Sequence, residues 1–326
     1  MDGTSAPTTP AVGRPDSDPT LTVSIWRRPL TYWAGFGLAC LLLQIVVYTR
    51  WIAGGGAHAH PARDYAIPRT MAITTHVGQG AAGLLFLLLG ALVWRECHAK
   101  GHITLKAAVF TGFCFSFWSN PYVSQFHYAA ANNRFDLNVE TWGPYLPGWR
   151  GDTPAVESFL MEVAYPVMLL WLVIALTIAR LLTDRRPHWG RGRVLAATTL
   201  AMLVCEPLLT HSYQRLGGFA YPRALPGHLT FFEGQWYQLP LTSTLAVVGF
   251  FIVPPLAMVL YTRTGHEVHI FRGGELLPPR LHPWGRLSAG IGLMNACTMG
   301  FQVTMALASL VSHPIDLPSW LDRPTL

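Results

Sequence analysis

Charged residues are scarce in this 326-residue chain, and lysine is almost absent. Asp, Glu, Lys and Arg together make up 12% of the residues, and Lys100 and Lys106 are the only lysines. By contrast 51% of the residues are hydrophobic, and several apolar runs reach the roughly 20 residues that a membrane-spanning helix needs. The net charge of +6 comes from arginines between these runs, so it reflects membrane topology and not a nucleic-acid surface. The composition predicts a polytopic helical membrane protein.

The familiar signatures of cofactor and metal chemistry are missing too. The five cysteines form no CxxC pair, which argues against a disulfide framework or a zinc site. No GxGxxG, P-loop, GxSxG or HExxH occurs, so dinucleotide, nucleotide-triphosphate, serine-esterase and zincin chemistries have no support. The histidine clusters His58-x-His60 and His266-x-x-His269 with His282 fall on opposite sides of the predicted membrane. We therefore expect neither a metal nor a cofactor.

The apolar runs divide the chain into a tail and one membrane domain. Residues 1–28 are rich in Pro, Thr, Ser, Asp and Gly, and we expect them to be disordered. Residues 29–326 are expected to form a single all-α transmembrane bundle of about seven helices. The predicted spans cover residues 32–52, 71–94, 105–119, 159–182, 194–213, 236–261 and 287–312. The third is short, and Pro166 is expected to kink the fourth.

The arginine distribution sets the expected orientation. Of the 23 Lys and Arg residues, 15 fall in the tail and the second, fourth and sixth loops, and 8 fall on the other side. The positive-inside rule then places the N-terminus in the cytoplasm, with the C-terminus and residues 120–152 outside. Plentiful Arg beside scarce Lys is typical of a GC-rich bacterial genome. The expected location is thus a bacterial cytoplasmic membrane.

The connection between the third and fourth spans is the most unusual stretch. Roughly thirty residues dense in Asn, Asp, Glu, aromatics, Gly and Pro separate the two apolar runs. Structureless loops well beyond about 15 residues are uncommon unless they are functional or disordered. Disorder is disfavoured here because aromatics are abundant and charges are few. We expect an ordered outer loop that forms the wall of a site.

Carboxyl groups within or beside the spans are the candidate catalytic residues. A charged group inside a span costs at least about 2.5 kcal/mol, so Glu162 and Glu206 are expected to face a cavity unless they pair with arginines of the loops. Glu157 lies about 140° away from Glu162 around a helix, so only one of the two should face inward. Asp136 and Glu140 would share a face if their segment is helical, or they form a solvated loop face. Buried carboxyls have raised pKa values and serve as general acids, and the candidates are Glu162, Glu206 and Asp136.

Amide and aromatic side chains near the outer ends of the spans are the candidate substrate contacts. Amides orient substrate oxygens or cap turns, and aromatics form interfacial belts or line apolar pockets. Aromatic faces also stabilise developing cations. The predicted substrate-binding residues are Asn120, Tyr122, Asn132, Asn133, Glu140, Trp142, Tyr165, His211, Glu233 and Trp236.

The segment SNPYVSQFHYAAANNRFDLNVETWGPYLPGW, followed by a proline and a glutamate-bearing apolar run, resembles the AveC-like spirocyclases of actinobacteria. This resemblance implies a membrane enzyme of macrolide antibiotic biosynthesis that closes a polyketide dihydroxy-ketone to a spiroketal, in some members with dehydration. It implies an apolar, polyketide-derived substrate and no cofactor. The lipid bilayer is then the expected surroundings of the protein, and nucleic acid is not an expected partner.

Two other functions fit the same residues. A membrane terpene or meroterpenoid cyclase also needs a carboxylic acid donor, a base and an aromatic-lined pocket. A non-catalytic protein that binds or transports lipids or polyketides would need only the pocket. Transporters often carry internal repeats with paired broken helices, and no such repeat is evident here. The oligomeric state is left open by the sequence.

Overall fold

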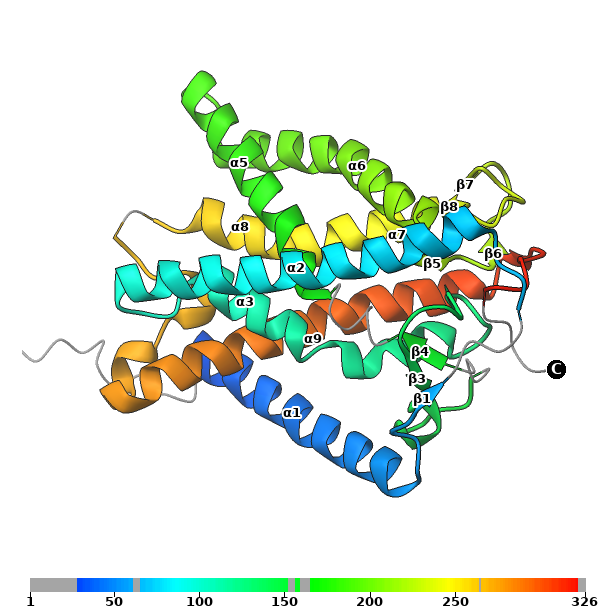
Figure 1. Ribbon diagram of the computed structural model, residues 1–326. Helices are drawn as coiled ribbons and strands as arrows, with labels where there is room; N and C mark the ends of the chain where they lie inside the picture. The colour runs from blue at the N-terminus through cyan, green and yellow to red at the C-terminus, as the bar shows by residue number, and fades with distance from the viewer. Residues whose placement is uncertain (1–27, 61–64, 152–155, 159–164, 264, 322–326) are drawn as a thin grey trace, which may run out of the picture.

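The computed structural model describes residues 28–60, 65–151, 156–158, 165–263 and 265–321. The predicted tail therefore lies outside the described residues, apart from Arg28. In the described part, six helical segments are long and apolar enough to cross a membrane. Most of them run lengthwise through the molecule, and α1 and α5 are inclined to the others (Figure 1). The predicted all-α polytopic bundle is confirmed.

The bounds of the helices follow the hydropathy closely. The five single long helices are α1 (Pro29–Ala53), α2 (Arg69–Lys100), α5 (Leu169–Arg185), α6 (Arg191–Arg215) and α9 (His282–Ser309). The sixth long segment joins α7 (Leu241–Ala246), the π-helix η5 (Val247–Ile252) and α8 (Val253–Tyr261). Short 3₁₀ turns η6 (His269–Phe271), η7 (Gly274–Leu276) and η8 (Pro279–Leu281) lead into α9.

The third predicted span is made of two short pieces. Helix α3 (Leu105–Cys114) is capped at its N-terminus by Thr104, whose side chain accepts a hydrogen bond from the backbone N–H of Ala107. It ends after 10 residues, and the 3₁₀ helix η3 (Phe117–Ser124) continues the segment with Pro121 inside it. The chain thus runs along the bundle a seventh time with a segment that is too short to count as a long span.

Prolines accompany two local departures from a regular helix. Pro166 lies just before Met168, where the helical segment is interrupted ahead of α5. Residues 159–164 lie outside the described residues, so the kink expected at Pro166 stays a prediction. Pro254 and Pro255 cannot donate to the carbonyls four residues earlier, and the helix widens into η5 just before them.

Helix α9 is the centre of the bundle, and glycines let its neighbours approach closely. A Cβ atom at Gly37 of α1 would collide with the backbone oxygen of Ser288, and one at Gly292 with the backbone oxygen of Trp33. Such backbone contact is how small residues pack helices in membranes, where apolar side chains gain little by leaving lipid. The α1–α9 crossing is therefore tight.

Short antiparallel strands join the loops at one end of the bundle. Strands β1 (Ala59–His60), β3 (Asn138–Glu140) and β4 (Val156–Ser158) form a sheet in the order β1-β3-β4. Three further pairs join β2 (Ala131–Asn132) to β5 (Phe219–Ala220), β6 (Arg223–Ala224) to β9 (His313–Pro314), and β7 (Thr230–Phe231) to β8 (Leu239–Pro240).

We call strands β1 to β9 and the loops that contain them the cap. All of these strands lie at the same end of the bundle (Figure 1). The described part of the outer loop contributes β2, β3, β4 and the 3₁₀ turn η4 (Gly143–Tyr145) to the cap. The described part of this loop is ordered, as predicted, because its backbone groups pair with β1, with β5 and with Leu321.

Candidate functional site

A cavity of about 290 Å³ lies between the cap and the helices α2, α5 and α6. Aliphatic and aromatic side chains form most of its wall, and a few polar groups reach it. Its lining residues are Gly78, Ala81, Ala82, Leu85, Asn120, Val123, Ala130, Tyr165, Val167, Met168, Trp171, Thr210, Tyr213, Leu216, Phe219, Tyr221, Val247 and Phe301. A mostly apolar pocket with a few aimed polar groups is typical of sites for apolar small molecules.

Two predicted residues, Asn120 and Tyr165, meet at the polar edge of this cavity. The Tyr165 hydroxyl donates to Asn120 Oδ1 at 3.4 Å, and Asn120 Nδ2 donates to Glu157 Oε2 at 3.0 Å. The other oxygen of Glu157 accepts from Thr141 Oγ1 at 3.0 Å. The Glu157 side chain is buried. The carboxyl group of Glu157 thus lies behind the wall residue Asn120, which connects it to the cavity by a hydrogen bond.

Asp136 lies behind a neighbouring part of the wall. Its two oxygens accept hydrogen bonds from Gln79 Nε2 at 2.6 Å and from Ser158 Oγ at 3.3 Å. Burial raises the pKa of Asp136 to about 7, and the hydrogen bonds from Gln79 and Ser158 oppose the rise. The carboxyl interacts electrostatically with Tyr213, which lines the cavity. Asp136 can therefore hold or release a proton near neutral pH.

Glu206 is buried on the inner face of α6. Because Glu206, Thr210 and Tyr213 are spaced by four and three residues, they share one face of the helix. The Thr210 hydroxyl donates to Glu206 Oε1 at 2.6 Å, and Thr210 itself lines the cavity. Glu206 Oε2 has no hydrogen-bond partner among the described residues. The carboxyl thus lies behind the wall and does not line the cavity itself.

Three tyrosines line the cavity, and each has a carboxyl group nearby. Tyr165 interacts electrostatically with Glu157, and Tyr221 interacts with Glu206. Tyr213 is the neighbour of Asp136 described above. The Tyr221 hydroxyl lies 2.5 Å from Ser243 Oγ, and burial raises the pKa of this phenol above its usual range. These phenols therefore present neutral hydrogen-bond donors to the cavity.

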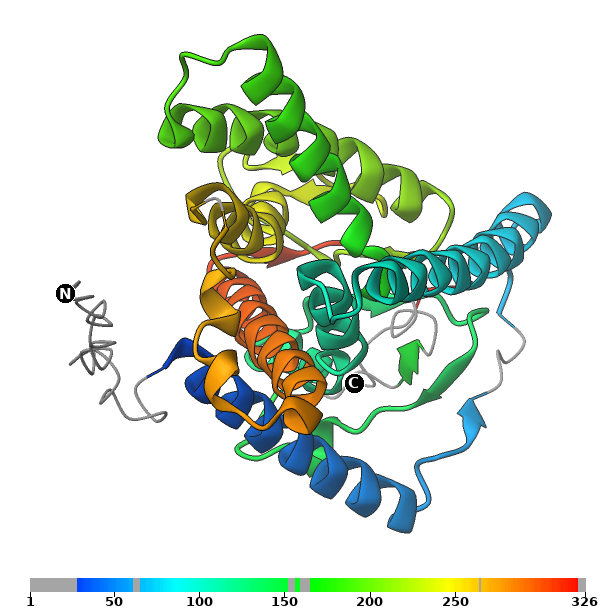
Figure 2. The ribbon, with the colours of Figure 1, turned by 90° about the vertical axis from the view of Figure 1, so that its left-hand side faces the viewer.

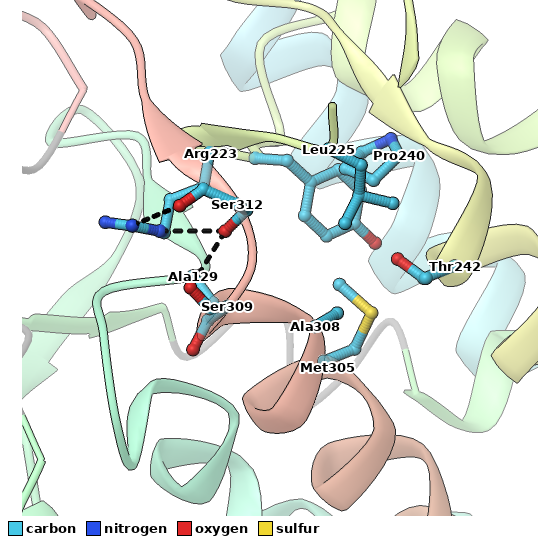
Figure 3. A pocket seen from close by; sticks show the side chains of 10 residues that line it. Ala129, Arg223, Leu225, Pro240, Thr242, Met305, Ala308, Ser309 and Ser312 are labelled. Atoms are coloured by element: carbon cyan, nitrogen blue, oxygen red, sulfur yellow. Dashed lines mark hydrogen bonds between the residues drawn. The ribbon is translucent and has the colours of Figure 1, made fainter. Parts of the chain in front are cut away.

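Tyr221 also lines a much smaller cavity, together with the residues labelled in Figure 3. The smaller cavity measures about 20 Å³, which is room for one water molecule. At its edge, Arg223 donates from Nε to Ser312 Oγ at 2.9 Å and from Nη2 to the Ser312 carbonyl at 2.6 Å. An organic substrate does not fit there, so the larger cavity is the candidate site.

Four predicted substrate-binding residues hold the cap together and do not line the cavity. They are Tyr122, Asn132, Asn133 and Trp142. Asn133, for example, donates to Thr75 Oγ1 at 2.9 Å and to the carbonyl of Gly217 at 2.7 Å. Trp142 is buried and donates to the backbone oxygen of Trp118 at 2.6 Å. In the structure these polar groups join loops.

Two predicted acidic residues lie on the surface. The segment around Glu140 is a strand, so of the two alternatives for Asp136 and Glu140 the shared helical face does not occur. Asp136 is buried, whereas Glu140 is exposed and lies 3.8 Å from His58. Glu233 is partly exposed and lies 3.4 Å from His313. Neither glutamate lines the cavity.

Two further predicted residues belong to an aromatic cluster at the edge of the cap. The ring of His211 stacks on Phe232 with centroids 4.7 Å apart, and Trp236 packs edge-on against Trp320 at 4.9 Å. Neither His211 nor Trp236 lines the cavity. Glu162 falls outside the described residues, so its predicted catalytic role stays a prediction.

The sequence interpretation missed three residues of the site. Tyr213 follows Glu206 by seven residues, and this helical spacing is a signal that places it on the same inward face. Glu157 was weighed only as an alternative to Glu162 on one helix, but it lies in β4 and contacts the cavity residue Asn120. No signal marks Tyr221, because its position depends on the β2–β5 pairing of distant loops.

Within the described ranges, no group of three or more His, Cys, Asp and Glu side chains is placed to hold a metal ion. The expectation that the protein uses neither a metal nor a cofactor stays a prediction.

The comparison with protein families bears on the chemistry of this cavity. The model of the family described as Spirocyclase AveC-like matches residues 101–318, about two thirds of the chain. This chain belongs to the AveC-like spirocyclase family. The family predicted from the sequence is therefore confirmed. No curated protein and no solved structure matches the chain.

The family match covers most of the site. The segment from 101 to 318 contains Asn120, Asp136, Glu157, Tyr165 and Glu206, whereas α2 precedes it. Membership in a spirocyclase family supports a cyclase over a non-catalytic lipid-binding protein. It also favours spiroketal closure over terpene cyclisation.

Proposed function

We propose that this spirocyclase closes a polyketide dihydroxy-ketone to a spiroketal inside the 290 Å³ cavity. The observation that carries the proposal is the polar edge of an otherwise apolar cavity, where Tyr165, Asn120 and Glu157 are joined by hydrogen bonds. The apolar wall accommodates the carbon chain. The polar edge orients the oxygens of the substrate, and carboxyl groups behind the wall supply the proton transfers that ring closure needs.

The reaction requires an acid and a base but no oxidant or reductant. One hydroxyl of the substrate adds to the ketone and forms a hemiketal, in which the former carbonyl oxygen becomes a hydroxyl group. Protonation of this hydroxyl releases it as water and leaves an oxocarbenium ion. The second substrate hydroxyl then adds to the cationic carbon and gives up its proton to a base. A subsequent dehydration of the product would use the same acid and base.

Tyr165 and its partners are suited to orienting the oxygens of the substrate. When substrate binds, the neutral Tyr165 phenol turns its single proton from Asn120 Oδ1 to the ketone oxygen, while Asn120 stays hydrogen-bonded to Glu157. Aromatic faces of Trp171 and Phe219 in the wall stabilise the oxocarbenium ion. A wall that holds the chain in one folded conformation contributes several kcal/mol more.

Asp136 is our choice for the group that exchanges the proton of the departing hydroxyl. With a pKa of about 7 it is partly protonated at neutral pH, where a general acid is most effective. Tyr213 lies between Asp136 and the cavity as the neighbour of both. Glu206, behind Thr210, and Glu162 are the remaining proposed catalytic carboxyls.

The orientation of the protein follows from the charge asymmetry of its loops. We place the N-terminus in the bacterial cytoplasm and the cap outside, because 15 of the 23 Lys and Arg residues then face inward. Cysteine-accessibility labelling at the exposed positions Glu140 in the cap and Arg186 between α5 and α6 tests this. Labelling of only the Glu140 position from outside is expected, and equal labelling of both would refute the orientation.

The function is tested with purified protein in lipid nanodiscs and a synthetic dihydroxy-ketone polyketide. Spiroketals also form without a catalyst, so the assay follows both the rate and the ratio of spiro epimers. We expect acceleration of at least about 10²-fold and a single dominant epimer. A wild-type protein that changes neither the rate nor the epimer ratio would overturn the proposal.

A further inference from the structure

Side-chain contacts join helix α2 to the rest of the protein on either side of residues 80–85. Near the cap, Thr75 accepts a hydrogen bond from Asn133 at 2.9 Å, and Gln79 donates to Asp136 at 2.6 Å. Towards the opposite end, Phe86 stacks on Phe110 of α3 with ring centroids 5.5 Å apart. Figure 2 shows α2 at the periphery of the bundle beside α3.

The middle of α2 lies over the cavity with very little side-chain bulk. Gly78, Ala81, Ala82 and Leu85 recur with helical spacing and line the cavity on one face. At Gly78, and also at Gly80 and Gly83 nearby, a Cβ atom would meet nothing within 4 Å among the described residues. The glycines of this segment therefore do not serve close helix packing, unlike those at the α1–α9 crossing.

The cavity reaches the outer surface of the protein at α2. Ala81 lines the cavity and is also exposed. An apolar chain bound in the cavity is most stable when its non-reacting part extends past this point into the hydrocarbon of the bilayer.

We propose that the Gly78–Leu85 segment of α2 forms a lateral portal, through which the substrate enters from the bilayer and beside which its non-reacting part stays in lipid. The small residues of this segment make it the least bulky part of the wall. The substrate class is thus a membrane-dissolved polyketide, and water-soluble precursors are disfavoured. This inference rests on the function proposed above.

A matched pair of substitutions tests the portal. Ala81→Trp adds bulk on the cavity face of α2, whereas Leu84→Trp adds it on a neighbouring face that does not line the cavity and where Leu84 is 69% exposed. In nanodiscs we expect Ala81→Trp to lower kcat/KM for the full-length polyketide at least about tenfold, and Leu84→Trp less than about twofold. Full activity of Ala81→Trp would overturn the portal and leave the proposed function intact.

A second measurement does not depend on catalysis or on the fold of one variant. A photoreactive diazirine fatty acid is added to phosphatidylcholine vesicles that contain wild-type protein, and labelled peptides are mapped by mass spectrometry. We expect labelling of the cavity residues Met168 and Trp171, with a loss of at least about fivefold in Ala81→Trp and in Gly78→Leu but not in Leu84→Trp. Labelling confined to outward residues such as Leu84 would overturn the portal, even in an active enzyme.

Discussion

The two sides of the cavity are built on different physical principles. On the cap side, Asn120, Asp136 and Glu157 are buried or half-buried, and each is connected by side-chain hydrogen bonds to residues more than 20 positions away in the chain or in a neighbouring strand. On the α2 side, Gly78, Ala81 and Ala82 have no polar groups in their side chains and little contact area. The cap wall is held by directional bonds, whereas the small residues of α2 that line the cavity make none, and Gln79 beside them donates to Asp136.

This difference separates the chemistry of the site from access to it. A buried polar group must keep its partners, because an unsatisfied one costs about 1–3 kcal/mol, so the cap side holds its groups in fixed positions. An apolar helix at the periphery loses little when lipid replaces a protein contact, so α2 can move at small cost. Substitutions on the cap side should therefore affect catalysis most, and those on α2 should affect entry and stability.

The largest effect is expected for Asp136→Asn. The amide keeps the shape of the side chain but has no transferable proton, so we expect the rate to fall about 10²-fold with the protein folded. Glu140→Gln is the control, because Glu140 is an exposed acid four residues away. The comparison is measured as turnover of the dihydroxy-ketone in nanodiscs.

A pH profile sharpens this test. If Asp136 is the general acid, the wild-type rate falls as the pH rises through about 7, where the carboxyl loses its proton. The residual rate of Asp136→Asn should lack this dependence. Equal rates and equal pH profiles for the variant and the wild type would exclude Asp136 and direct attention to Glu162 and Glu206.

A smaller loss of rate is expected for Tyr165→Phe. Removing the hydroxyl that lies 3.4 Å from Asn120 Oδ1 takes one donor from the cavity, and we expect a loss of about tenfold together with a changed epimer ratio. The matched control is Tyr122→Phe, which removes the hydroxyl that donates to the carbonyl of Pro147 within the cap. That variant should lower the melting temperature and leave the epimer ratio unchanged.

The pKa of Asp136 also predicts how stability depends on pH. The folded state raises this pKa from 3.8 to about 7, so it binds the proton more tightly than the unfolded chain does. The resulting stabilisation is complete below about pH 4 and is lost as the pH rises through about 7. Between about pH 5 and about pH 8 we expect the melting temperature of the wild type to fall by several degrees more than that of Asp136→Asn. If the melting temperatures of the two proteins fall equally with pH, Asp136 does not titrate in a buried position.

The smallest effect is expected on α2. Gly80→Ala meets no atom within 4 Å among the described residues, and alanine favours a helix over glycine by about 1 kcal/mol. The melting temperature should therefore rise by a few degrees. The contrasting variant is Gly290→Ala, whose Cβ would collide with the backbone of Ala108 at the α3–α9 crossing and should destabilise the protein. A loss of stability in both variants would show that α2 is packed as tightly as α9.

Local sequence patterns predicted the bundle, but they predicted only part of the site. Apolar runs long enough to span a bilayer predicted α1, α2, α5, α6 and α9, with ends that differ by up to ten residues, because hydropathy is a sum over neighbours in the chain. Asn120 and Tyr165, chosen from the same pattern, do line the cavity. The interpretation went wrong at Glu140, because whether a short polar segment is a helix or a strand depends on its partners, here β1 and β4.

The sequence by itself determined the class of this protein, its family and the ordered loop, since these depend on composition and on a contiguous motif. Tertiary structure decided which carboxyls approach the cavity and which only join loops. Asp136 gains its raised pKa from burial against Gln79, 57 positions away, and Glu157 reaches the cavity through Asn120, 37 positions away. Burial and hydrogen bonding between distant segments exist only after packing, so no local pattern reveals them.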